Sequence, residues 1–183
     1  LHPFLMADSV FQENSVVCTA PSKTFNLAGL QTSNIFIPDR KIRQEFKKSL
    51  LSNGLFGLNP FGTTACRVAY EEGEPWLEDL KRYLESNLQA LTNHFETYLP
   101  EIKVIRPQGT YLVWFDCRSL GLDKHQFRKL FLDRARVFLD EGSLFGPEGD
   151  GFQRINIACP RPLLMEALGR IVAAIKGLPG NIA

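Results

Sequence analysis

The sequence has no long apolar run, no excess of one charge and few cysteines. No uninterrupted apolar stretch approaches the roughly 20 residues that a membrane-spanning helix needs, so we expect no membrane segment. Lys and Arg number 21 against 20 Asp and Glu, and the resulting net charge of +1 argues against a nucleic-acid-binding protein. The 14 phenylalanines and the aromatic content of 11% exclude intrinsic disorder.

The cysteines are too far apart for a disulfide framework or a zinc site. They stand at positions 18, 66, 117 and 159 without any CxxC pair, a spacing typical of free thiols in a reducing compartment. The three histidines are isolated from one another, which argues against a metal site. We therefore expect a cytoplasmic protein without a bound metal.

The first residues of the sequence show neither the pattern of a secretion signal nor an initiator methionine. The opening residues, LHPF, lack the basic segment followed by an apolar one that marks a signal peptide. From the missing methionine we expect that the chain begins partway into a longer protein.

Hydrophobic periodicity divides the chain into three regions. Residues 1–74 resemble part of an α/β sheet domain, residues 75–98 carry an apolar stripe at helical spacing, and residues 99–183 have the texture of a compact α+β domain. Strands are expected at 15–20, 34–37, 102–105, 110–115, 137–140 and 152–158, and further helices at 40–51, 61–72, 123–136 and 161–175.

Lys23 is the first residue that could carry chemistry. It lies where the first predicted strand turns into a loop, a place from which a side chain reaches the crevice at a strand's carboxyl end. A partly desolvated, neutral lysine amine can form a Schiff base with a carbonyl group. The alternative is an ordinary exposed lysine at a turn, and the spacing alone favours that alternative.

Arg154 is the second candidate. Strand alternation places it on one face with Phe152 and Asn156. A cation in mid-strand beside an aromatic ring favours a carboxylate clamp, because the guanidinium matches the carboxylate fork. The alternative is a sheet face open to water with Arg154 solvated, and the pattern alone slightly favours it. The opposite face carries Gln153, Ile155 and Ile157.

The segment at 20–31 (APSKTFNLAGLQ) closely resembles the cofactor-lysine motif of fold-type I pyridoxal-phosphate enzymes. Within the class I and II aminotransferases, it is most similar to the branch of MalY/PatB-type cystathionine β-lyases, which are C–S lyases. Further stretches resemble the same family in the same order: 59–62 (NPFG), 73–77 (GEPWL) with 83–87 (YLESN), 107–114 (PQGTYLVW) and 152–160 (FQRINIACP).

The resemblance implies a role for each matching residue. Lys23 would bind pyridoxal 5′-phosphate covalently and later remove the substrate Cα proton, and Ser22 would bond the cofactor phosphate. Arg154 would clamp the α-carboxylate of an amino-acid substrate. Asn59 would contribute to substrate binding from a loop that reaches the partner subunit's site, which implies a homodimer. Tyr111 and Trp114 are interpreted as core residues of the C-terminal domain, and the alternative is that either of them borders the substrate pocket.

Two departures from the family pattern matter. Many aminotransferases of this fold carry an arginine eight positions after the lysine, where this chain has Gln31. A neutral amide can bond the cofactor phosphate but supplies no charge, which fits the C–S lyase branch. The phosphate loop, ring-stacking aromatic and pyridinium aspartate of the family's first half have no counterpart here, so we expect the C-terminal half of an enzyme of about twice this length.

The expected fold class is α/β, as the C-terminal part of the pyridoxal-phosphate-dependent transferase fold. Residues 1–74 would complete the cofactor-binding large domain, 75–98 would form a connecting helix and 99–183 a small α+β domain. The expected function is β-elimination from L-cystathionine or related cysteine S-conjugates, giving thiol, pyruvate and ammonia. The alternatives are an aminotransferase that passes the amino group to a 2-oxo acid, and a domain fragment without activity.

Overall fold

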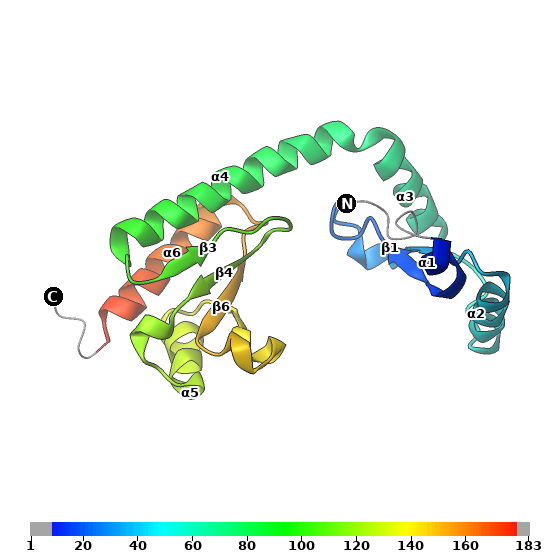
Figure 1. Ribbon diagram of the computed structural model, residues 1–183. Coiled ribbons are helices and arrows are strands. Elements are labelled where there is room, and N and C mark those ends of the chain that lie inside the picture. Colours follow the sequence, from blue (N-terminus) through cyan, green and yellow to red (C-terminus); the bar gives the residue numbers. More distant parts are fainter. Residues whose placement is uncertain (1–8, 179–183) are drawn as a thin grey trace. The chain divides into compact units, whose positions relative to one another are not determined.

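The computed structural model describes residues 9–178, which fall into two compact units with a border between Asp79 and Leu80. This border lies inside helix α4 (Glu74–Tyr98), drawn in green in Figure 1. Within the described range, no helix is both long enough and apolar enough to cross a membrane. The same range contains no group of three or more His, Cys, Asp or Glu side chains that could hold a metal ion.

The first unit combines a two-stranded sheet with short helices. Its two strands pair antiparallel, with Val17 opposite Phe36. The elements in chain order are α1 (Ser9–Asn14), β1 (Val17–Thr19), the 3-10 helix η2 (Ala28–Leu30), β2 (Asn34–Phe36), α2 (Arg40–Ser52) and α3 (Pro60–Glu72).

Helices α2 and α3 begin where the sequence predicts them, because capping residues stand at their N-terminal ends. The Asp39 carboxylate accepts a hydrogen bond from the backbone N–H of Ile42 at 2.7 Å and so caps α2. The Asn59 side chain accepts from the N–H of Phe61 at 3.1 Å, and Pro60 occupies the first position of α3. Both predicted helices are confirmed to within one residue at each end.

The second unit is built on a four-stranded sheet in the order β3-β4-β6-β5, in which all neighbouring strands are antiparallel. Its strands are β3 (Lys103–Ile105), β4 (Leu112–Asp116), β5 (Asp140–Glu141) and β6 (Phe152–Asn156). Besides α4, its helices are η3 (Arg118–Leu120), α5 (Lys124–Arg128), the π-helical η4 (Lys129–Arg134), η5 (Gly142–Phe145), η6 (Pro147–Gly149) and α6 (Arg161–Lys176).

The buried core belongs to this second unit. Every residue of the core cluster lies between Leu88 and Ile175. Phe95 of α4 packs edge-on against Phe115 of β4, with ring centroids 5.2 Å apart, and Phe115 meets Phe131 of η4 at 6.3 Å. Figure 1 shows α6 beside the C-terminal part of α4. The apolar stripe predicted for the long helix is thus buried in its second half.

The segment after α5 differs from the prediction. The helix expected to run to Arg136 widens into a π-helical turn, in which the N–H of Ala135 donates to the Leu130 carbonyl at 2.9 Å, and Arg136 adopts a φ of 55°. The N–H of Val137 donates to the Phe131 carbonyl instead of to a neighbouring strand. The strand predicted at 137–140 is therefore reduced to β5, which begins only at Asp140.

Candidate functional site

Lys23 lies in a tight turn directly after β1. The N–H of Phe25 donates to the carbonyl of Pro21, and the N–H of Leu27 donates to the carbonyl of Ser22, both at 2.9 Å. Asn26 closes the turn with a φ of 55°, a backbone conformation that asparagine tolerates better than most residues. The turn leaves Lys23 exposed and Ser22 half-buried, so the amine is available at the surface of the first unit.

An aromatic cluster holds this turn against the junction of α3 and α4. The ring of Phe25 stacks on Trp76 at a centroid distance of 6.1 Å and meets Tyr70 edge-on at 6.0 Å. A Cβ added to Gly73 would lie 2.4 Å from the Ala69 carbonyl oxygen and 2.7 Å from the Phe25 ring, so a side chain at this position would displace the ring. The 73–77 motif therefore has a local role, since it anchors the residue two positions after Lys23.

The 59–62 motif braces the other end of the same segment. The Asn59 amide donates to the carbonyl of Leu30 at 3.4 Å, next to Gln31, which is exposed and left-handed at φ 51° and ψ 44°. A Cβ added to Gly62 would lie 2.0 Å from the Thr32 hydroxyl oxygen and 3.0 Å from the Leu30 carbonyl oxygen. Helix α3 thus supports the segment from Lys23 to Gln31 at both ends.

Arg154 is held from several sides in the second unit. Its Nε and Nη2 donate to the same carboxylate oxygen of Asp140, at 3.1 and 2.8 Å. Its guanidinium carbon lies 4.3 Å from the centre of the Phe145 ring and 5.9 Å from that of Trp114. The predicted strand face is confirmed, because Gln153, Ile155 and Ile157 are buried while Arg154 is not. The alternative of a freely solvated arginine is wrong.

Trp114 corrects the sequence-based interpretation. Tyr111 packs against the core as predicted, but Trp114 is only half-buried and lies directly opposite Arg154 in the β4–β6 pairing. Val113 and Phe115 face the core, so alternation along β4 turns Trp114 to the Arg154 face. The contacts of Asp140 and Phe145 with Arg154 could not be predicted from the sequence. A two-residue strand and the turn after it carry no local pattern that indicates which residues will lie beside Arg154.

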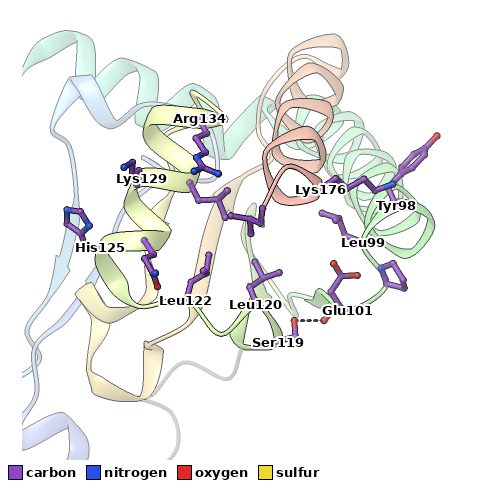
Figure 2. Close-up of a pocket in the computed structure, with 14 residues that line it drawn as sticks. Tyr98, Leu99, Glu101, Ser119, Leu120, Leu122, His125, Lys129, Arg134 and Lys176 are labelled. Carbon is purple, nitrogen blue, oxygen red and sulfur yellow. Dashed lines mark hydrogen bonds between the residues drawn. The ribbon is translucent and has the colours of Figure 1, made fainter. Parts of the chain in front are cut away.

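A cavity of about 1110 Å³ in the second unit contains none of the predicted site residues. Its walls come from the end of α4, from η3, from α5 with η4, and from the end of α6. Figure 2 shows His125, Lys129 and Arg134 on one wall and Tyr98 and Lys176 on the other. The candidate residues belong instead to two places, with Lys23, Ser22, Gln31 and Asn59 in the first unit and Arg154 in the second.

Residues 4–171 match the family described as aminotransferase class I and II. The chain belongs to this family. It is 43% identical over 173 residues to cystathionine beta-lyase PatB of Bacillus subtilis, a match that covers 94% of this chain and 45% of PatB. It is 30% identical over 177 residues to protein MalY of Escherichia coli, covering 96% of this chain and 45% of MalY.

Solved structures agree with this family membership. Cystalysin from Treponema denticola, whose crystal structure contains pyridoxal 5′-phosphate, matches with a TM-score of 0.91 and 37% identity over 97% of this chain and 45% of that one. The pyridoxal-phosphate-bound C–S lyase from Staphylococcus hominis matches with a TM-score of 0.76 and 32% identity, over 88% and 42%. The family and the fold class predicted from the sequence are confirmed. The chain spans less than half the length of each of these relatives.

Proposed function

We propose that the whole protein is a pyridoxal-phosphate-dependent carbon–sulfur β-lyase. Its substrate would be L-cystathionine or a related cysteine S-conjugate, and its products a thiol, pyruvate and ammonia. The observation that carries this proposal is the 43% identity to a cystathionine beta-lyase along 94% of the chain. The family match takes in both Lys23 and Arg154.

The residues around Lys23 fit pyridoxal phosphate. Lys23 offers an exposed primary amine that can bind the cofactor aldehyde covalently, on a turn that Phe25 anchors. The Ser22 hydroxyl and the Gln31 amide can donate hydrogen bonds to the phosphate from the same segment. When bound, the cofactor supplies an electron sink for the electron pair left on the substrate Cα.

The chain's own groups would orient the substrate and move the proton. The Arg154 guanidinium binds the α-carboxylate through parallel N–H···O bonds, which fixes the direction of the Cα–H bond. The Lys23 amine, once free and neutral, accepts the Cα proton at Nζ. Loss of the thiolate from Cβ then completes the elimination, and hydrolysis of the unsaturated amine that is released gives pyruvate and ammonia.

We also propose a cytoplasmic homodimer in which Asn59 contributes to substrate binding in the partner's site. The apolar side chains flanking Asn59 support an interface, because Phe56, Leu58 and Phe61 are 72–78% exposed. In this proposal residues 1–74 belong to the cofactor-binding large domain, 75–98 form the connecting helix and 99–183 form the small domain.

The test uses the whole protein with added pyridoxal phosphate. We expect thiol and pyruvate release from L-cystathionine without a 2-oxo acid, and borohydride reduction should leave the cofactor on Lys23. Lys23→Ala should lower turnover at least about a hundredfold, while Lys41→Ala, an exposed lysine on α2, should not. Amino transfer that depends on a 2-oxo acid would favour an aminotransferase instead. Absence of both activities would overturn the proposal.

A further inference from the structure

The backbone fixes Asp140 beside Arg154. The two residues are direct cross-strand partners in the β5–β6 pairing. The turn between these strands is closed by a direct approach of two glycines, since a Cβ added to Gly142 would lie 2.1 Å from the Gly149 carbonyl oxygen. The carboxylate therefore lies next to the guanidinium through the sheet itself, and no ligand is needed to bring it there.

The contacts leave part of the guanidinium free. Asp140 takes up the edge formed by Nε and Nη2, and the Phe145 ring covers one face. Within residues 9–178, Nη1 of Arg154 has no hydrogen-bond partner. The side chain of Arg154 remains 22% exposed. An incoming carboxylate can thus be received by Nη1 and the second N–H of Nη2, while Nε and the first N–H of Nη2 are already held.

We propose that Asp140 is a positioning residue for Arg154. It holds the guanidinium in the orientation that receives the substrate α-carboxylate, and it does not itself touch the substrate. This inference rests on the proposed function, because that function assigns the carboxylate to Arg154. Without Asp140 the arginine would have to lose its side-chain freedom when substrate binds, which weakens binding by about three- to tenfold.

The alternative is that Asp140 competes with the substrate carboxylate for Arg154. A carboxylate that merely occupies the clamp until substrate displaces it would weaken binding through its charge, and its removal would tighten binding. The two roles therefore predict opposite signs for the same substitution. Asp140→Asn separates them further, because it keeps an oxygen acceptor for Arg154 and removes the charge.

The second unit contains a matched control. Asp116 and Arg118 form another Asp–Arg pair at the end of β4, with Nη2 and Oδ2 2.7 Å apart. The hydrogen bond from Arg118 lowers the pKa of the Asp116 carboxyl, so this is a formed ion pair. Asp116→Ala removes a pair of the same chemistry from the same sheet without touching Arg154.

The experiment measures binding of L-alanine and L-alanine methyl ester to the whole, cofactor-loaded protein by calorimetry. L-Alanine has no leaving group at Cβ, and its ester lacks the carboxylate. We expect Asp140→Ala to weaken L-alanine binding about three- to tenfold and to change ester binding less than about twofold. Asp140→Asn should recover part of the loss, and Asp116→Ala should change neither affinity.

A double variant tests whether Asp140 acts through Arg154. In an Arg154→Ala background, Asp140→Ala should have no further effect on L-alanine binding. Tighter binding in Asp140→Ala, an equal loss for the ester, or an equal loss in Asp116→Ala would each overturn the proposal. So would a wild-type protein that does not distinguish L-alanine from its ester.

Failure of the lyase proposal would look different. A wild-type protein that prefers L-alanine to its ester but releases no thiol from L-cystathionine would exclude the lyase. The role of Asp140 would stand in that case, because the binding measurement involves no elimination.

Discussion

A buried amide joins the long helix to the chain that follows Arg154. Asn87 of α4 is fully buried, and its Nδ2 donates to the carbonyls of Ile157 at 2.8 Å and Cys159 at 3.0 Å. Its Oδ1 accepts from Nε of Arg161 at 2.7 Å. Tyr83, in the same 83–87 motif, accepts from the backbone N–H of Arg161 through its hydroxyl at 2.7 Å. The motif thus anchors the connection between β6 and α6.

Asn87→Ala should destabilise the second unit by about 2–4 kcal/mol, because the carbonyls of Ile157 and Cys159 lose their donor and Nε of Arg161 loses its acceptor. Urea denaturation followed by circular dichroism measures the change. Asn93→Ala is the control, since Asn93 is exposed on the same helix and its side chain accepts a hydrogen bond from the equally exposed Gln89, so its effect should stay within about 0.5 kcal/mol. Equal losses in both variants would contradict the anchoring role.

Helix α3 supports the segment from Lys23 to Thr32 because two glycines, one at each end of the helix, allow this segment to approach closely. Its N-terminal end meets Leu30 and Thr32 where Gly62 has no side chain, and its C-terminal end meets Phe25 where Gly73 has none. Both glycines are needed for close approach and not for an unusual backbone angle, since neither has a positive φ. The helix therefore determines where the turn that carries Lys23 can lie.

Gly62→Ala should push the 28–32 segment away from α3 and cost about 1–3 kcal/mol, as overpacking does elsewhere. Adding Thr32→Ala should recover part of this loss, because it removes the hydroxyl that the new methyl would meet at 2.0 Å. Gly57→Ala is the control, because nothing lies within 4 Å of an added Cβ there.

The free energy of unfolding of the first unit can be measured through the fluorescence of Trp76. The chain has two tryptophans, and Trp114→Phe removes the signal of the other one, which lies in the second unit. If Gly62→Ala were as stable as Gly57→Ala, the 28–32 segment would be able to move away from α3 without a loss in the free energy of unfolding.

The elements that local chemistry specifies could be predicted from the sequence. Asp39 and Pro60 mark the starts of α2 and α3, and alternation along β6 places Arg154 on the correct face. What could not be predicted depends on contacts between distant residues. Most of the strand expected at 137–140 does not form, because the backbone N–H of Val137 donates a hydrogen bond to the carbonyl of Phe131. The partner of Arg154 depends on the β5–β6 register, for which a two-residue strand gives no pattern.

At the scale of the whole molecule, apolar burial is unequal between the two units. The core cluster lies between Leu88 and Ile175, entirely within the second unit. Among residues 9–79, the buried hydrophobic side chains are Ile37, Cys66 and Ala69. The first unit instead exposes large apolar side chains, including Leu55, Phe56, Leu58 and Phe61 at 62–78%. Its own burial therefore provides little stabilisation, and we expect the first unit to become more stable when another surface covers these side chains.

Hydrogen exchange of this chain alone should therefore separate the units. Amides of β4 and β6, which lie in the core sheet, should exchange at least about a hundredfold more slowly than those of β1 and β2, a difference of about 2.7 kcal/mol in opening free energy. Repeating the measurement on the whole, cofactor-loaded protein should raise the protection of β1 and β2, because the exposed apolar side chains would then be covered. Equal protection of both units in the chain alone would mean that the first unit is stable without such a cover.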